Sequence, residues 1–309
     1  MSEPERSALA EARVILEACP PSTEEQEKAL ALLRQSFACY NSFHAVSVPD
    51  LQDNAEFSRT RQRVPNDAFA AWLKDQTDKP ISLYKVCVGA RREEFEDWLD
   101  HADGLGCRDI FLVGSDSSEK QLADGTLRID SAAAVARSRG FRCGGIIIPT
   151  RRTQFGPRPA SIDETRRLTG KIREVGLSFF TTQILCEGQW MSCLLLDLVR
   201  AMEREELPQI FLTFSPFVCA EDLTFARKTL GVYVPGDVSR MLRGARSMRE
   251  ASISFLLLVW ERLATFATEI GYPREKIGVN VEYLDSRNPR NVDAAFELAE
   301  EFGRVLQRR

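Results

Sequence analysis

The stretch that decides the fold is Val14-Ile15-Leu16-Glu17-Ala18-Cys19-Pro20-Pro21. Its first three residues form a short apolar run of the kind found in a buried β-strand, and the two prolines end the strand because proline has no N–H to donate to a strand ladder. Glu17 stands at the carboxyl end of this strand. Burying an unpaired carboxylate is costly, so the position of Glu17 predicts a functional group.

The rest of the chain repeats this layout of an apolar strand, a polar residue at its end and a helix. After the first strand, we expect strands over 43–48, 81–88, 109–113, 143–148, 177–182, 209–214 and 278–283, with helices between nearly all of them. Strands that alternate with helices form parallel βαβ units, and eight such units predict a closed (β/α)8 TIM barrel. An open doubly wound sheet is the alternative, which the absence of G-x-G-x-x-G after the first strand disfavours.

The composition is consistent with one domain. The chain has 309 residues, of which 44% are hydrophobic, enough for a single barrel core. We expect residues 1–12 to be a flexible N-terminal tail and residues 13–309 to form the barrel domain. The net charge of -4 gives no reason to expect a nucleic-acid partner. The chain has no run of 18 apolar residues, which predicts a cytoplasmic protein without a membrane partner; a homo-oligomer is compatible with the sequence.

Eight cysteines and two histidines limit the possible chemistry. The cysteines form no C-x-x-C pair and most lie in apolar runs, which favours reduced, buried thiols over disulfides or a metal site. With only His44 and His101, a three-histidine zinc site is impossible. We therefore expect no metal.

Polar residues follow the expected strands at their carboxyl ends, where the active site of a (β/α)8 barrel lies. Acids, amides and hydroxyls dominate this set, which suits a hydrogen-bond-rich organic substrate and one proton transfer. The set is Glu17, Ser47, Tyr84, Lys85, Asp116, Thr150, Arg151, Arg152, Gln183, Ser215 and Glu282.

Four motifs occur in an order that resembles the methylenetetrahydrofolate reductase family. Residues 16–22 (LEACPPS) are similar to the family's opening motif, in which a Glu before two prolines is the catalytic acid. Residues 106–116 (GCRDIFLVGSD) resemble a segment whose Asp contacts the pterin and the flavin. Lys171, Gly176 and residues 180–183 (FTTQ) resemble a stretch whose Gln binds folate. Residues 214–216 (FSP) and 234–235 (VP) resemble a later proline pair, so the resemblance covers about residues 17–282.

This resemblance implies an oxidoreductase that interconverts 5,10-methylenetetrahydrofolate and 5-methyltetrahydrofolate with NAD(P)H. Glu17 would be the general acid, its pKa raised by the apolar surroundings. It would protonate N10 as the five-membered ring opens to an N5-iminium, which a hydride then reduces. The resemblance and the strand ends together suggest substrate contacts at Asp116, Gln183 and Glu282, and contacts to FAD or a nicotinamide at Ser47, Tyr84, Arg151, Arg152 and Lys171.

The flavin segment departs from the family pattern. The family reads Ala-Tyr-Pro-Glu-x-His where this chain has residues 147–152 (IIPTRR), and Tyr84 stands where the family has a His. Residues 280–282 (NVE) resemble a divergent branch of these reductases that is thought to work without bound flavin. The resemblance thus implies folate chemistry more strongly than it implies FAD, and a protein without bound FAD is the alternative.

Two functions remain open at this point. One is the folate-linked oxidoreductase; the other is a folate- or pterin-binding protein without redox activity, such as a methyl-transfer partner or a regulator on the same barrel. Retention of Glu17 favours the enzyme, because binding alone does not require an acid. Structural roles are the alternatives for single residues: ion pairs for Glu17 and Glu282, a helix N-cap for Asp116, and loop positions for Gln183, Arg151 and Arg152.

Overall fold

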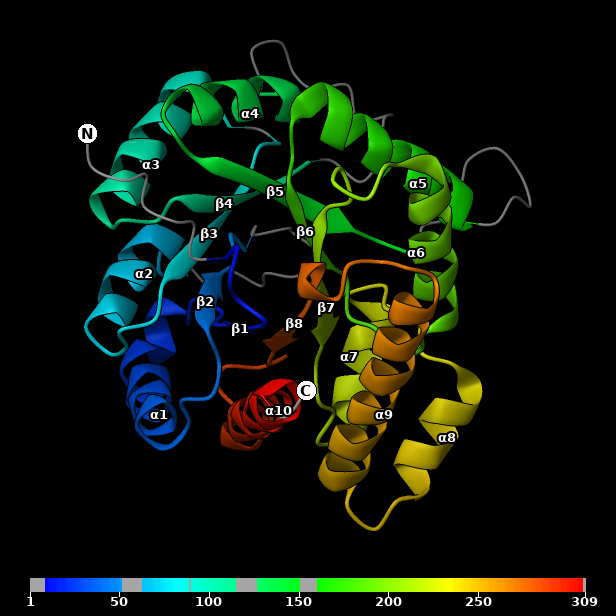
Figure 1. Ribbon diagram of the computed structural model, residues 1–309. Coiled ribbons are helices and arrows are strands. Elements are labelled where there is room, and N and C mark those ends of the chain that lie inside the picture. Colours follow the sequence, from blue (N-terminus) through cyan, green and yellow to red (C-terminus); the bar gives the residue numbers. More distant parts are fainter. Residues whose placement is uncertain (1–8, 52–62, 89, 115–126, 151–159, 308–309) are drawn as a thin grey trace.

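Eight parallel strands form a closed barrel in the computed structural model of this chain (Figure 1). The structure describes residues 9–51, 63–88, 90–114, 127–150 and 160–307. Each strand pairs with the next one along the chain, and the eighth pairs with the first. The predicted (β/α)8 barrel is therefore confirmed. The strands are β1 (Val14–Glu17), β2 (Ala45–Val48), β3 (Ile81–Val86), β4 (Asp109–Val113), β5 (Arg142–Ile147), β6 (Phe179–Thr182), β7 (Gln209–Phe214) and β8 (Ile277–Glu282).

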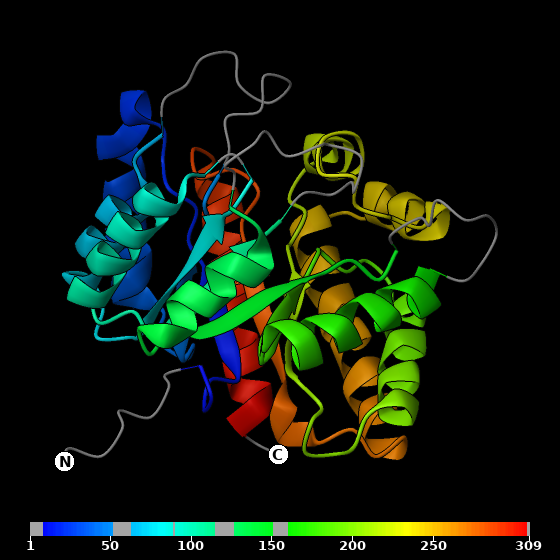
Figure 2. The same ribbon diagram turned by 90° about the horizontal axis from the view of Figure 1, so that it is seen from above.

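Helices surround the strands, with α1 to α3 on one side of the barrel and α7 to α9 on the opposite side (Figure 1, Figure 2). Within the described ranges they are α1 (Gln26–Cys39), α2 (Asn66–Lys74), α3 (Arg92–Gly104), α4 (Ile129–Ser138), α5 (Ala160–Gly170), α6 (Gln189–Ala201), α7 (Ala220–Lys228), α8 (Gly236–Gly244), α9 (Met248–Glu269) and α10 (Pro289–Gln307). Short 3-10 turns occur at Thr23–Glu25 and Arg274–Lys276.

Two helical segments add detail to the expected alternation of strands and helices. The helical segment between β5 and β6 consists of α5 followed by a π-helical segment, Lys171–Val175, and it ends at Gly176. Gly176 has a φ of +76°, a left-handed conformation that glycine adopts at low cost. Helix α8 is an additional helix between β7 and β8; it begins directly after Pro235, and proline suits a helix start because it has no N–H to leave unpaired.

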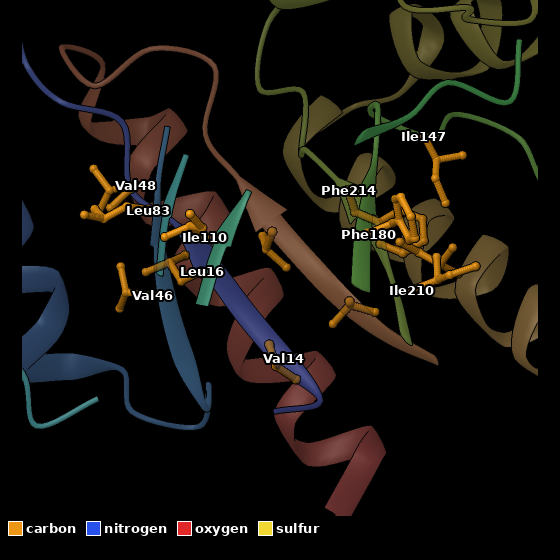
Figure 3. Packing of buried hydrophobic residues seen from close by; sticks show 14 of the residues in the cluster. Val14, Leu16, Val46, Val48, Leu83, Ile110, Ile147, Phe180, Ile210 and Phe214 are labelled. Carbon is orange, nitrogen blue, oxygen red and sulfur yellow. The ribbon is translucent and has the colours of Figure 1, made fainter. Parts of the chain in front are cut away.

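The outer faces of the strands form the main hydrophobic core with the helices. Figure 3 shows the side chains that point outward from several strands, including Leu16, Val46, Ile110 and Phe214, all fully buried. The opposite faces form an inner cluster that fills the barrel, composed of Ile15, Ala45, Tyr84, Phe111, Phe179 and Phe211 together with Leu9 and Ala12. Strands buried on both faces explain why the sequence reads as apolar runs without alternation.

Residues 9–12 close the amino end of the barrel, which corrects the expected tail over residues 1–12. Leu9 and Ala12 are each only 1% exposed. The backbone N–H of Leu9 donates to Asp109 Oδ2 at 3.0 Å, and Gln209 Nε2 donates to the carbonyl oxygens of Leu9 at 2.8 Å and Ala12 at 3.3 Å. The barrel domain therefore includes residue 9; residues 1–8 lie outside the described residues.

Helix α9 is long and apolar enough to cross a membrane by length and composition alone. In the structure it packs on the barrel through Leu256, Trp260 and Leu263, which are buried and lie about one helical turn apart. The Trp260 ring meets Phe302 of α10 edge-on, with the ring centroids 6.0 Å apart. This spacing is typical of a helix packed on a protein core, and the absence of a membrane partner stays a prediction.

A substitution at Gly278 in β8 would test how closely the barrel interior is packed. A Cβ at this position would lie 2.8 Å from the carbonyl oxygen of Arg13 and 2.8 Å from Phe211 Cδ1. We expect Gly278→Ala to lower the free energy of unfolding by about 1–3 kcal/mol, the usual cost of overpacking. Gly104→Ala at the end of α3 is the control, because a Cβ there meets nothing within 4 Å. Urea denaturation of both variants measures the difference, and equal midpoints would contradict the close packing.

Candidate functional site

Polar side chains from six strands meet inside the barrel near its carboxyl end. Alternate residues of a barrel strand face inward, and Ile15 and Ala45 belong to the inner cluster. Glu17 and Ser47, two residues further along, therefore also face inward. In the strand register, Glu17 lies opposite Ser47 on one side and Glu282 on the other. Among the described residues, the hydrogen-bonded set is Glu17, Ser47, Tyr84, Thr181, Thr213, Asn280 and Glu282.

Glu17 is the centre of this network. Its Oε2 accepts hydrogen bonds from Tyr84 OH at 3.0 Å and from Asn280 Nδ2 at 2.8 Å, and its carboxyl group is also hydrogen-bonded to Glu282. The residue is 8% exposed. Burial raises the pKa of Glu17 above its ordinary value, and the three hydrogen bonds offset part of that increase. The rise agrees with the expectation from its apolar neighbours.

Tyr84 is held from three directions. Its hydroxyl also shares a hydrogen bond with Thr181 Oγ1 at 3.2 Å, and its ring stacks on Phe111 with the centroids 4.4 Å apart. Its backbone carbonyl accepts from Asn66 Nδ2 at 2.7 Å. Burial and the charge of Glu17 raise the pKa of Tyr84 well above its usual range. The phenol therefore stays protonated and acts as a donor to Glu17.

Asn280 is held equally firmly. Its Nδ2 lies 3.3 Å from Thr213 Oγ1, and its Oδ1 accepts from Ser47 Oγ at 3.4 Å. Both Asn280 and Ser47 are fully buried. Because these partners determine which end of the amide carries the NH2 group, Asn280 is oriented as a donor to Glu17.

Glu282 forms a carboxyl pair with Glu17. The two residues are direct neighbours on β8 and β1, and their carboxyl groups are hydrogen-bonded to each other. Burial and the charge of Glu17 raise the pKa of Glu282 well above its ordinary value. Two carboxyl groups in hydrogen-bond contact cannot both ionise easily, so they share a proton. Glu282 is partly exposed, whereas Glu17 is buried.

The chain just beyond Glu17 is held in place at the barrel mouth. Tyr283 OH donates to the carbonyl oxygen of Cys19 at 3.3 Å, and Arg63 Nη1 donates to the carbonyl oxygen of Pro20 at 3.0 Å. Burial raises the pKa of the Cys19 thiol well above its ordinary value. Cys19 is therefore a neutral thiol and is unsuited to act as a nucleophile.

The next residues predicted at strand ends are Gln183, Ser215 and Asp116, and none of them is part of the hydrogen-bond network in the described part of the chain. Gln183 follows β6 and donates from Nε2 to the carbonyl oxygen of Leu230 at 2.8 Å. It lines a hollow of about 10 Å³ together with Thr150 and Tyr233, which is room for one water molecule. Ser215 follows β7, and its Oγ is buried without a hydrogen-bond partner among the described residues. Asp116 lies outside the described residues.

Two of the five expected cofactor contacts, Ser47 and Tyr84, belong to the network around Glu17. Arg151 and Arg152 lie outside the described residues. Ser47 and Tyr84 are inside the barrel, with their hydroxyls bonded to Asn280, Glu17 and Thr181. Since both hydroxyls are buried and already hydrogen-bonded, these two residues do not fit contacts to a flavin. Lys171 is partly buried and begins the π-helical segment after α5.

Sequence reasoning missed three members of the network: Thr181, Thr213 and Asn280. A usable signal was present, because Thr181 and Asn280 stand two residues before Gln183 and Glu282. Strand side chains alternate with a period of two, so a polar residue at that spacing lies one layer deeper on the same inward face.

Comparisons with known proteins support the fold. No family model and no curated protein sequence matches the chain. An uncharacterised protein from Clostridium thermocellum that binds two copies of 5-methyl-5,6,7,8-tetrahydrofolic acid is similar over 95% of this chain and 96% of its own, with 20% identity and a TM-score of 0.74. The carboxyl transferase domain of Rhizobium etli pyruvate carboxylase is similar over 96% of this chain and 48% of its own, with 9% identity and a TM-score of 0.50. At these identities the comparisons show the barrel fold.

The carboxyl pair predicts a pH dependence of stability. In the unfolded chain both acids ionise near the ordinary value of 4.5, whereas the folded pair keeps a proton well above that pH. The contribution of the pair to the free energy of unfolding is therefore fully present below about pH 4.5. It decreases with rising pH by up to about 1.4 kcal/mol per pH unit until the folded pair loses its proton. We expect Glu282→Gln to reduce this decrease.

Urea denaturation between about pH 5 and about pH 8 measures this effect. Glu27→Gln on the exposed side of α1 is the matched control, because it makes the same chemical change at the surface. The wild type and the control are expected to lose more stability over this range than Glu282→Gln. Parallel curves for all three proteins would show that the pair does not hold a proton.

Proposed function

We propose that this protein is a folate-dependent oxidoreductase that interconverts 5,10-methylenetetrahydrofolate and 5-methyltetrahydrofolate with NAD(P)H, and that Glu17 is its general acid. The observation that supports this most is a buried carboxyl group with a raised pKa at the carboxyl end of the barrel, held by Tyr84, Asn280 and Glu282. A general acid for neutral pH requires such a raised pKa.

The substrate class rests on a structural neighbour. The Clostridium thermocellum protein with the same barrel binds 5-methyltetrahydrofolic acid, which is one of the two folates in the proposed reaction. The motif order in this chain points to the same pair of folates. We therefore take the barrel mouth above Glu17 as the folate site, with Gln183 and Asp116 as contacts to the pterin.

The proposed reaction needs one proton and one hydride. Protonation of N10 breaks the bond between N10 and the bridging carbon, which leaves an iminium at N5. A hydride from NAD(P)H adds to that carbon and gives the N5-methyl group. Tyr84 and Asn280 fix the Glu17 carboxyl from two strands. This fixed orientation decreases the entropic cost of aligning the acid with N10.

Glu17→Gln tests the role of the acid. We expect the loss of the proton donor to lower NAD(P)H-dependent turnover of methylenetetrahydrofolate by about 10²- to 10⁴-fold, while binding of 5-methyltetrahydrofolate is retained. NAD(P)H absorbance follows turnover, and calorimetry follows binding. Glu27→Gln, an exposed change on α1, is the control and should match the wild type.

Equal turnover in Glu17→Gln and the wild type would refute the assigned role. A wild-type protein that binds folate but consumes no NAD(P)H would instead support the alternative function of a methyl-transfer partner or regulator. These two results are distinguishable because the first concerns one residue and the second concerns the reaction.

A separate prediction concerns the identity of the hydride donor. Residues 147–152 depart from the flavin-binding pattern of the reductase family. Ser47 and Tyr84 are hydrogen-bonded inside the barrel. We therefore expect purified protein to show no flavin absorbance, and added FAD to leave turnover unchanged. An absorbance spectrum of the protein as isolated from cells is the measurement. A yellow protein that loses activity when its flavin is removed would contradict direct use of NAD(P)H.

A further inference from the structure

The hydrogen bonds around Glu17 and Glu282 are unequal. Glu17 Oε2 receives two neutral donors, Tyr84 OH at 3.0 Å and Asn280 Nδ2 at 2.8 Å. The carboxyl of Glu282 is hydrogen-bonded to Glu17. Donors that point at a carboxylate stabilise its charged form. Among the described residues these two donors act on Glu17, so Glu17 is the better of the two positions for the pair's negative charge and Glu282 is the better position for its proton.

We propose that Glu282 stores the catalytic proton in the free protein and passes it to Glu17, which delivers it to the substrate. This inference rests on the proposed function, and it assigns a role in proton supply to a second residue of the same site. Three features of the structure carry it: the direct register of the two residues on β1 and β8, the contact between their carboxyl groups, and the two donors that described residues direct at Glu17.

Charge balance makes this order of events reasonable. Before reaction the pair carries one negative charge and the folate ring is neutral. When Glu282 gives its proton to Glu17, and Glu17 gives it to N10, the O–H bond of Glu282 is broken and an N–H bond is formed. The pair then carries two negative charges beside one positive iminium. Opposite charges at close range in a water-poor site attract strongly, so the cation compensates for the second carboxylate.

The proton must then return to the pair. The hydride neutralises the iminium and leaves two adjacent carboxylates, an arrangement that favours uptake of a proton. In the proposed cycle Glu282 takes this proton from water, which restores the pair. Among the described residues, Tyr84, Cys19 and Tyr283 lie near the pair, and their pKa values are all raised well above the usual range, so they remain neutral. The nearby cation in this part of the chain is Arg63, which acts on Cys19 and Tyr283 and donates to the carbonyl oxygen of Pro20.

Two substitutions at Glu282 separate proton storage from a structural role. Glu282→Gln keeps the size of the side chain and a donor toward Glu17 but has no proton to release. Glu282→Asp keeps the acid but is one methylene shorter. Proton storage predicts that the Gln variant loses about 100-fold or more in kcat, while the Asp variant retains more activity. A purely structural role predicts the opposite order, because Gln preserves the contact and Asp breaks it.

Infrared spectroscopy of the free protein tests the pair without any substrate. The wild type is expected to show the carbonyl stretch of a neutral carboxyl group at neutral pH, and Glu282→Gln is expected to lose it. Persistence of this band in Glu282→Gln would place the proton on Glu17 and overturn the proposal, as would its absence from the wild type. Thermal unfolding of both proteins checks that each is folded.

This test also separates the proposal from the proposed function. A wild type that consumes no NAD(P)H with methylenetetrahydrofolate would refute the oxidoreductase, whereas the infrared band would still report whether Glu282 holds a proton. An active wild type with equal kcat in Glu282→Gln would instead refute proton storage and leave the oxidoreductase intact.

Discussion

The register between β1 and β8 is the constraint on which the site depends. Closure of the barrel makes the first and last strands neighbours and sets Glu17 directly beside Glu282. Two carboxyl groups on neighbouring residues of adjacent strands repel each other when both are charged. The pair is tolerated because Tyr84 and Asn280 donate to Glu17 and because the pair keeps a proton. A shift of either strand by one residue would turn one carboxyl outward.

The barrel below the pair provides a rigid and apolar base. Phe111 and Phe179 meet edge-on, with their ring centroids 4.9 Å apart, and Tyr84 stacks on Phe111. Leu9 and Ala12 close the amino end under these rings. Close packing of this kind excludes water from below, so only the carboxyl end offers an approach. Burial inside the barrel raises the pKa of both acids.

Only uncharged donors hold Glu17 in the described network, and this explains its chemistry. A bidentate arginine would lower the pKa of Glu17 and remove its use as an acid at neutral pH. Tyrosine and asparagine orient the carboxyl and leave its proton affinity high. Acids elsewhere in the chain differ: Glu164 is buried and paired with Arg167, and its Oε1 accepts from the N–H of Ile148. That acid holds the end of β5 and has a structural role.

The sequence by itself determined the order of strands and helices, the closed barrel and the place of Glu17 at a strand end, because these follow from local apolar runs and their breaks. It placed Glu282 at the end of the last strand, but its contact with Glu17 arises only when the barrel closes and brings together residues 265 positions apart in the chain. Tyr84 and Ser47 were expected to bind a cofactor, and only the tertiary structure gave their hydroxyls partners inside the barrel. Such partners depend on strand register and barrel closure, which no local sequence pattern specifies.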